Sequence, residues 1–335
     1  MQTIILKSNP GTRFRFGEAL GAFTEETHNA QKSTSQYIHS DTLWSALVNA
    51  WALHSPETVD NFVSACKNGQ FNLSSAFYCV EYSGKHVYFL PKPISLNLLQ
   101  YDEPKKLKKI KFISKGVWED GLLPNDWFDS EKCTLVQNES MVALKSEIDI
   151  PIMLFEVETS PKTHARDITD RENSFYFETY LFLSYSDNYK TDWYFFMENN
   201  LPQNMQNDFL KAMQTLVNLG IGGERSAGCG SLSGFQIREI DLIPVEISHY
   251  RSSISLIAPK ENELTKNSLY QIIKRGGRFI EKGKCLPMIQ MLLEGVVTDT
   301  EINGRIVELS SEPLIMRYGL NISIPLHNNF INREI

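Results

Sequence analysis

The chain has 335 residues, of which 42% are hydrophobic and 22% are charged. These fractions are ordinary for a folded globular protein, and the length predicts two subdomains rather than one core. The formal net charge of −7 argues against a free-standing protein that binds nucleic acid through a general positive field. It leaves room for a local basic groove inside a larger assembly.

Cysteine spacing and the N-terminal sequence indicate the cellular compartment of the protein. The five cysteines lie far apart and include no C-x-x-C pair, so neither a zinc ribbon nor a disulfide framework is indicated. The first residues, MQTIILKSNP, contain no charged segment followed by a long apolar one. No apolar run approaches the ~20 residues needed to cross a bilayer. We therefore expect a soluble cytoplasmic protein, not associated with a membrane, that uses no metal and no cofactor.

The N-terminal region predicts a strand, a polar loop and a helix. Residues 3–6 form a short apolar strand that ends at the turn signal Asn9-Pro10-Gly11. A polar loop covers 12–37. A helix capped by Ser40 or Asp41 is predicted next, because apolar residues recur at helical spacing: Leu43, Trp44, Leu47, Val48 and Trp51. We expect both tryptophans to lie in the core.

The next region predicts sheet structure around a lysine-rich segment. Residues 76–82 and 86–90 flank Ser83-Gly84-Lys85 and predict a hairpin, and the sequence LPKP at 90–93 is expected to end the sheet. Aromatic and apolar residues predict further strands within 151–199. Between them, residues 101–116 predict either a phosphate-attracting segment or a solvated edge, because they contain six lysines: Lys105, Lys106, Lys108, Lys109, Lys111 and Lys115.

A second helix leads into a glycine-rich loop. The helix is predicted to begin near Asn207 and Asp208, and Gly220 stands where a C-terminal cap belongs. Its expected buried face consists of Phe209, Leu210, Met213, Leu216 and Val217. The loop GIGGERSAGCG, residues 220–230, holds five glycines, and GFQIREI then resumes a strand pattern.

The order of these elements predicts the fold class. The series β, α, β, β, α, glycine loop, β is typical of an α+β, ferredoxin-like (RRM-like) domain with a long insertion after the first helix. We assign residues 1–242 to this domain and about 91–150 to the insertion. Residues 243–335 are predicted to form a second, degenerate ferredoxin-like domain that includes a helix over 267–274.

The glycine loop fits neither of the common nucleotide-binding motifs. A Rossmann fingerprint needs a strand before it and a helix after it, whereas here the order is inverted, and Gly228, Gly230 and Gly234 are one residue too widely spaced. A P-loop needs lysine where Cys229 stands. Two interpretations remain. The backbone N–H groups around Arg225 form a nest for RNA phosphate, or the glycines allow a tight helix-to-strand crossover.

Six segments occur in an order found in one protein family: IHSDTLWSAL (38–47), FLPKP (89–93), KKLKKIKFIS (105–114), Asp170-Arg171, GIGGERSAGCG (220–230) and RYGLNISIPL (317–326). Together they resemble the RAMP superfamily of CRISPR proteins. More narrowly, they resemble the Cas-five-like, fourth subunit of type III-A (Csm) effector complexes. The chain departs from the family after Asp170-Arg171, where Glu172-Asn173 replaces the Thr-Gly common in relatives.

The resemblance implies a non-catalytic subunit in antiviral defence that binds the 5′ handle of the guide RNA. It implies docking to the large polymerase-like signature subunit and contact with the Cas-seven-like backbone subunit. A thumb hairpin, placed at about 160–174, is expected to disturb the guide–target RNA duplex at its first position. The expected RNA-contacting residues are Gly222, Gly223, Glu224, Arg225, Ser226, Ala227, Gly228 and Gly230 in the loop, with Arg13, Arg15, Arg166, Arg171, His39 and Ser40 outside it.

Two other functions stay open on the sequence. One is a metal-independent endoribonuclease of the same superfamily, in which His28 or His39 assists attack by the RNA 2′-OH. Such enzymes usually carry the glycine loop near the C-terminus, whereas about a hundred residues follow Gly234 here. The other is a scaffold that binds only protein. Competing roles also stay open for single residues: Ser40 as a helix cap, and Arg166 and Arg171 as partners of neighbouring acids.

Overall fold

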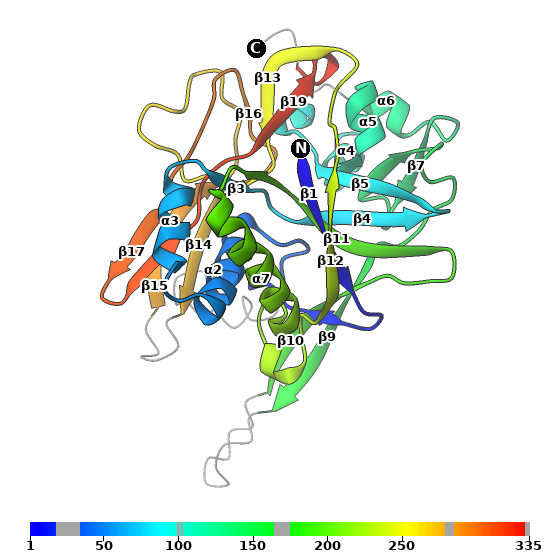
Figure 1. The fold of residues 1–335 in the computed structure, drawn as a ribbon. Helices are drawn as coiled ribbons and strands as arrows, with labels where there is room; N and C mark the ends of the chain where they lie inside the picture. Colours follow the sequence, from blue (N-terminus) through cyan, green and yellow to red (C-terminus); the bar gives the residue numbers. More distant parts are fainter. Residues whose placement is uncertain (18–33, 99–100, 102, 164–174, 279–284, 332–335) are drawn as a thin grey trace.

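The computed structural model describes residues 1–17, 34–98, 101, 103–163, 175–278 and 285–331. It is a mixed α+β structure with one large sheet and few helices (Figure 1), so the predicted α+β class is confirmed. Among these residues, no helix is both long enough and apolar enough to span a membrane.

Four strands form one end of the nine-stranded sheet, in the order β12-β1-β11-β4. They are β1 (Gln2–Ser8), β4 (Phe77–Tyr82), β11 (Tyr189–Asn199) and β12 (Leu232–Glu239). Both β1 and β4 pair antiparallel with β11, and β12 pairs antiparallel with β1. The short β3 (Phe71–Leu73) also pairs with β11. The chain crosses from β1 to β4 through a helix and from β11 to β12 through another, which is the predicted element order.

The two crossover helices are α2 (Ser40–His54) and α7 (Gln203–Leu219), which contact each other, and α3 (Val59–Lys67) follows α2. Helix α2 forms because its apolar residues fall on one side; Trp51 stacks on Phe62 of α3 with ring centroids 4.2 Å apart. Trp44 and Trp51 lie in the core, as predicted.

Helix α7 differs from its prediction at one end and at one residue. It begins at Gln203, earlier than predicted, because Pro202 has a fixed φ of −55° and no N–H to satisfy at the helix start. Four of the five predicted apolar residues are buried, whereas Leu210 is 43% exposed. Gly220 ends the helix with φ +74°, as the sequence indicated.

The sheet continues beyond Leu90, so the prediction that LPKP ends it was wrong. Strand β5 (Lys85–Pro91) pairs with β4 and then with β6 (Phe112–Ser114), and the Lys92 N–H bonds to the Lys111 carbonyl. Proline is tolerated here because Pro91 stands at the end of its strand. Strands β8 (Met141–Leu144) and β7 (Cys133–Val136) complete the edge. Between these strands lie η1 (Ile94–Leu98), α4 (Pro104–Lys109), α5 (Lys115–Asp120) and α6 (Pro124–Trp127).

A long two-stranded ribbon leaves the body of the molecule (Figure 1). Strand β9 (Phe155–Thr163) pairs with β10 (Phe175–Leu183) over the whole length of both, and β2 (Arg13–Phe14) pairs with the base of β10. The predicted thumb at about 160–174 therefore begins in this ribbon, and its residues 164–174 lie outside the described part of the chain.

The C-terminal part is built from strands. One sheet contains β16 (Val297–Thr298), β13 (Ile247–Ser253) and β19 (Ser323–His327); two further pairs are β14 (Ile272–Arg278) with β15 (Cys285–Leu292), and β17 (Val307–Ser311) with β18 (Leu314–Arg317). The helix predicted over 267–274 was wrong, because residues 272–275 pair with β15 instead.

The main core crosses the predicted domain boundary at 242. Its buried side chains come from the large sheet, from α2 and α7, and from C-terminal residues that include Tyr318 and Ile324. The Tyr318 ring stacks on Trp44 at 5.6 Å, and its hydroxyl accepts a hydrogen bond from the Leu73 N–H at 2.8 Å. The C-terminal strands are thereby held against the start of α2, where the candidate site lies.

Candidate nucleic-acid interface

The glycine loop is anchored to the chain segment around β2. The Gly230 N–H donates to the Arg13 carbonyl at 2.7 Å, and the Gly223 N–H donates to the Arg15 carbonyl at 2.8 Å. The Ile221 N–H donates to the Gly230 carbonyl at 2.9 Å and closes the base of the loop. These bonds place the loop beside the N-terminal arginines, and residues 223–228 remain exposed.

Close packing explains several of the glycines. A Cβ on Gly230 would lie 2.0 Å from the Ile221 carbonyl oxygen, and one on Gly222 would lie 2.5 Å from the Arg15 carbonyl oxygen. Both residues also have positive φ angles, +75° and +97°, which favour glycine. The crossover interpretation therefore accounts for the base of the loop.

Most backbone N–H groups of the loop are not free to form the predicted nest. The N–H groups of Ala227 and Cys229 donate to the Glu224 carbonyl, and that of Gly228 donates to the Arg225 carbonyl. Together with the three bonds at the base, these bonds use six N–H groups of the loop, which are therefore not free to bind an anion. An anion meeting this loop would instead meet side chains, above all the exposed Arg225, which makes no ion pair among the described residues.

Replacing Gly230 with alanine is expected to lower the free energy of unfolding by more than the matched change Gly234→Ala. Forcing a non-glycine residue into this backbone region costs about 1–3 kcal/mol, and the clash with the Ile221 carbonyl adds to that. A Cβ on Gly234 meets nothing within 4 Å. Urea unfolding followed by circular dichroism compares the two variants; equal midpoints would show that the loop base tolerates a side chain.

Three arginines surround a cleft of about 330 Å³ between the loop, the start of α2 and the C-terminal strands. Arg225 comes from the loop, Arg275 from β14 and Arg317 from β18. Asp41, at the start of α2, is the one carboxylate among the described residues that line it. We call this hollow the arginine cleft.

Asp41 is held by two of these arginines. Its carboxylate accepts hydrogen bonds from Nε and Nη2 of Arg275 at 2.9 and 2.8 Å, and from Nη1 of Arg317 at 2.5 Å. Burial alone would raise the pKa of Asp41, but the attraction of Arg275 and then of Arg317 outweighs it and holds the pKa well below its ordinary value. Two cations thus share one anion, and Arg225 adds a third cation to the lining, so the described lining residues carry an excess of positive charge.

Helix α2 has no side-chain cap, so the predicted capping role of Ser40 or Asp41 was wrong. His39 occupies the N-cap position and its side chain makes no capping bond. The Ser40 hydroxyl instead accepts a hydrogen bond from the Leu256 N–H at 3.1 Å, and the Asp41 carboxylate turns to the arginines. Both side chains therefore form hydrogen bonds with residues far along the chain and not with the N–H groups at the start of α2.

The other arginines predicted to touch RNA lie in different settings. Arg15 pairs with Glu178 at 2.8 Å and with Glu224 at 3.3 Å, so its charge is largely compensated. The Arg13 guanidinium lies over the Tyr180 ring at 5.3 Å, and its backbone supports the loop. Arg166 and Arg171 lie outside the described residues. The structure thus brings Arg13, Arg15 and the glycine loop together, as expected.

His39 lies in a buried polar cluster. Its Nδ1 is 2.9 Å from Oε1 of Glu294, which also accepts hydrogen bonds from the hydroxyls of Ser75 and Tyr37. Burial alone would raise the pKa of Glu294, but the charge and hydrogen bond of His39 and the hydrogen bond from Ser75 lower it. His39 is only 5% exposed, so a substrate would have to enter the cluster to reach it. His28, the other histidine considered for catalysis, lies outside the described residues.

Sequence reasoning missed Arg275 and Arg317 as site residues. Arg275 follows a stretch that was predicted as helix, and Arg317 opens the segment RYGLNISIPL without a local signal of its own. Their role depends on both reaching Asp41, which is 234 and 276 positions away in the sequence. Asp41 in IHSDTLWSAL, interpreted from the sequence as a candidate helix cap, was the available signal, because a buried carboxylate needs a cation.

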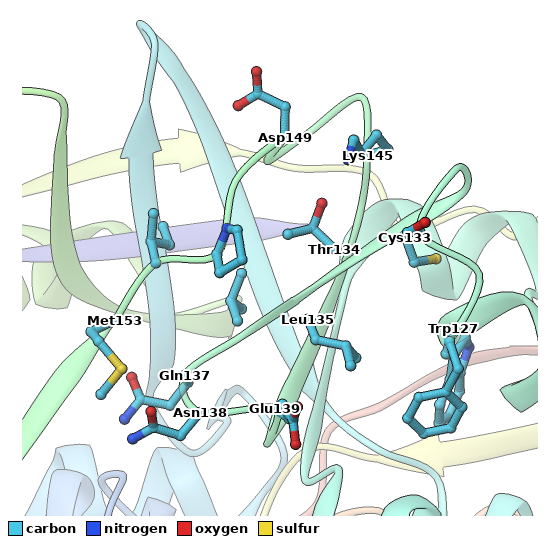
Figure 2. A pocket seen from close by; sticks show the side chains of 15 residues that line it. Trp127, Cys133, Thr134, Leu135, Gln137, Asn138, Glu139, Lys145, Asp149 and Met153 are labelled. Carbon is cyan, nitrogen blue, oxygen red and sulfur yellow. The ribbon is translucent and has the colours of Figure 1, made fainter.

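Another hollow, of about 490 Å³, lies beside β7 and β8 (Figure 2). Its lining is mainly apolar and includes Trp127, Leu135 and Met153. The amide of Gln137 there is already used, because its oxygen accepts bonds from the N–H groups of residues 154 and 155. Lys145 is offset by Glu139 and Asp149 in the same lining, so this hollow does not resemble an RNA site.

The comparisons with known proteins agree with the predicted resemblance. Residues 246–326 match the family model described as the CRISPR Csm4 C-terminal domain. No curated protein matches the sequence significantly.

Several solved structures share the fold over nearly the whole chain. A chain of a Csm3–Csm4 subcomplex of the type III-A CRISPR-Cas interference complex is 21% identical, with a TM-score of 0.69 over 98% of this chain and 100% of that one. A chain of a Csm1–Csm4 cassette with AMPPNP is 20% identical, with a TM-score of 0.56 over 98% of each chain. The resemblance predicted from the sequence is thus confirmed by the C-terminal domain and by the fold.

Proposed function

We propose that this chain is the Csm4 subunit of a type III-A CRISPR effector complex and that it holds the single-stranded 5′ handle of the guide RNA. The observation that carries the proposal is the arginine cleft. It joins the glycine loop to strands β14 and β18, which belong to the part of the chain that matches the Csm4 C-terminal domain. Single-stranded RNA is recognised through phosphate contacts and splayed bases, and an open cleft with excess positive charge suits both.

The rest of the predicted role belongs to the same proposal. The strand order β12-β1-β11-β4 with two crossover helices supports a ferredoxin-like domain with an insertion that extends the sheet. The ribbon of β9 and β10 supports a thumb that meets the guide–target duplex. Docking to the large signature subunit and to the Cas-seven-like backbone subunit is proposed because solved relatives form Csm1–Csm4 and Csm3–Csm4 complexes. We propose that the subunit is non-catalytic and acts in the cytoplasm in antiviral defence.

The test is ultraviolet crosslinking of guide RNA in the reconstituted complex. We expect the 5′ handle to crosslink to residues 222–228, and expect a guide with a scrambled handle to crosslink there more weakly. A scaffold that binds only protein predicts no crosslink from this loop, and that result would contradict the proposal.

The nuclease alternative has its own assay. The isolated chain is incubated with repeat RNA in EDTA, and we expect no cleavage because His39 is buried and bonded to Glu294. Cleavage that disappears in a His28→Ala or a His39→Ala variant would replace our proposal with the ribonuclease.

A further inference from the structure

The lysine-rich segment divides into two groups in the folded chain. Lys106 pairs with Glu103 at 2.8 Å, Lys109 with Glu139 at 3.0 Å, and Lys115 with Glu119 at 2.5 Å. Lys105, Lys108 and Lys111 make no such pair among the described residues. Of these three, Lys108 and Lys111 line a separate hollow of about 560 Å³, which we call the lysine cleft.

A third lysine, Lys92, faces the same cleft and is mostly buried. It follows β5, and its backbone N–H bonds to the Lys111 carbonyl, which sets the two residues side by side. The Lys92 Nζ donates to the Leu107 carbonyl at 2.6 Å, and no described carboxylate lies within ion-pair distance. The residue is 9% exposed. Burial and the nearby charge of Lys111 lower the pKa of Lys92 to about 7.

Glu294 is the single carboxylate among the described lining residues, and it does not neutralise these amines. It is already bonded to His39, Ser75 and Tyr37. Among the described residues, the cleft therefore gathers three amines without a free anion. Lys108 and Lys111 are exposed at this cleft and have no ion-pair partner among the described residues, so they attract an anion from solution. An anion bound there would also favour the charged form of Lys92.

The lysine cleft and the arginine cleft are consecutive along the same elements. Tyr37 and His39 line the former, whereas Asp41 lines the latter. On β14, Ile273 lines the lysine cleft and Arg275 the arginine cleft. Residues two apart on a strand are separated by about 7 Å and face the same side, so the two clefts lie next to each other along β14.

We infer that the lysine cleft binds a phosphate of the single-stranded RNA that passes through the arginine cleft, with Lys92, Lys108 and Lys111 as its donors. The inference rests on the proposed function, since it assigns a second contact to the same strand. Phosphate is the matching chemistry because it accepts several charge-assisted hydrogen bonds at once. The cleft also offers Tyr37 and the amides of Gln36 and Asn97 to the attached nucleotide.

The test compares two double variants in the reconstituted complex. Lys108→Gln with Lys111→Gln removes two amines from the cleft, and Lys106→Gln with Lys109→Gln removes the same charge from ion pairs outside it. Affinity for guide RNA is measured over a salt series. We expect the cleft variant to bind about 5- to 30-fold more weakly, with the slope of log K against log salt reduced by about 0.7 for each lost phosphate contact. The control should stay within about twofold.

The variant Lys92→Met distinguishes an effect on RNA binding from an effect on stability. The ordinary pKa of lysine, about 10.4, applies to the unfolded chain, so below pH 7 the amine is charged in both states and the folded state bears the cost of burying it. Between pH 7 and 10 the amine loses its proton in the folded state but keeps it in the unfolded chain. The cost of burying the charge therefore falls as the pH rises. We therefore expect Lys92→Met to raise Tm at pH 6, with a smaller gain at pH 9, while weakening RNA binding. The groups that face Lys92 are Lys108, Lys111, Tyr37, His39 and Glu294.

The outcomes are distinguishable from failure of the proposed function. If the wild-type complex binds guide RNA with preference for the intact handle, but both double variants behave alike, only the lysine cleft inference is wrong. If the wild type shows no handle preference, the proposed function fails as well. Adenosine monophosphate is added as a competitor; complete competition at stoichiometric concentration would assign the cleft to a free nucleotide and overturn the inference.

Discussion

Asp41→Ala is expected to lower the free energy of unfolding by about 3–5 kcal/mol, because removal of one partner leaves buried charges without compensation. The carboxylate is 1% exposed, and the side chains of Arg275 and Arg317 are 5% and 12% exposed. Both guanidiniums would stay buried after the change. Because the two arginines come from strands far along the chain, the loss would also loosen the C-terminal part from the start of α2.

The dependence on pH has a definite sign. Because the folded-state pKa of Asp41 lies below its ordinary value, the ion pairs contribute fully above about pH 4, the pKa range of an unfolded aspartate. Their contribution is lost as the pH falls further, toward the folded-state pKa. Urea unfolding should therefore show a large difference between wild type and Asp41→Ala at pH 7 and a smaller one at pH 3.

Two further variants make this measurement specific. Asp187→Ala removes an exposed aspartate and should change stability by less than about 0.5 kcal/mol. Adding Arg317→Met to Asp41→Ala removes one of the orphaned cations and should recover part of the loss. A loss below about 1 kcal/mol for Asp41→Ala would mean that the arginines find other partners or that water reaches the site.

Arg225→Glu is expected to weaken binding of the intact 5′ handle by about 10- to 100-fold, since one arginine contact is worth about 1–3 kcal/mol. Arg225 is exposed at the mouth of the arginine cleft and has no ion-pair partner among the described residues. Its replacement should leave folding intact, unlike that of Asp41. The reconstituted complex is titrated with guides that carry intact or scrambled handles at fixed salt.

The control for this prediction is Arg305→Glu, which makes the same charge change at an exposed position outside the cleft lining. Arg225→Lys adds information on geometry, because lysine keeps the charge but cannot form the bidentate contacts of a guanidinium. Equal losses for Arg225→Glu and Arg305→Glu would show that only the overall charge matters, and would move the RNA site away from the loop.

The sequence predicted the local elements well where one face of each is apolar. Patterns of a few residues predicted strand β4, the hairpin turn at Ser83 and Gly84, and helix α2. The glycine loop was also found from sequence, because positive φ angles and close backbone contacts require glycine at Gly222 and Gly230.

Predictions failed where a long-range partner overrode a local preference. The pattern of residues 267–274 does not distinguish a helix from a strand. Pairing with β15 makes residues 272–275 a strand. The lysine-rich segment is one charged run in the sequence. In the fold, Lys106 and Lys109 form ion pairs, whereas Lys108 and Lys111 line a cleft.

The amino-acid sequence by itself therefore determined the class of the fold, the order of its elements, the family it resembles and the position of the glycine loop. These depend on hydrophobic periodicity and on backbone conformations that few residues can adopt. Only the tertiary structure decided what Asp41, Arg275, Arg317 and Lys92 do. A charged side chain acts through whatever lies within a few ångströms of it in the fold, and its partners here are up to 276 positions away in the sequence.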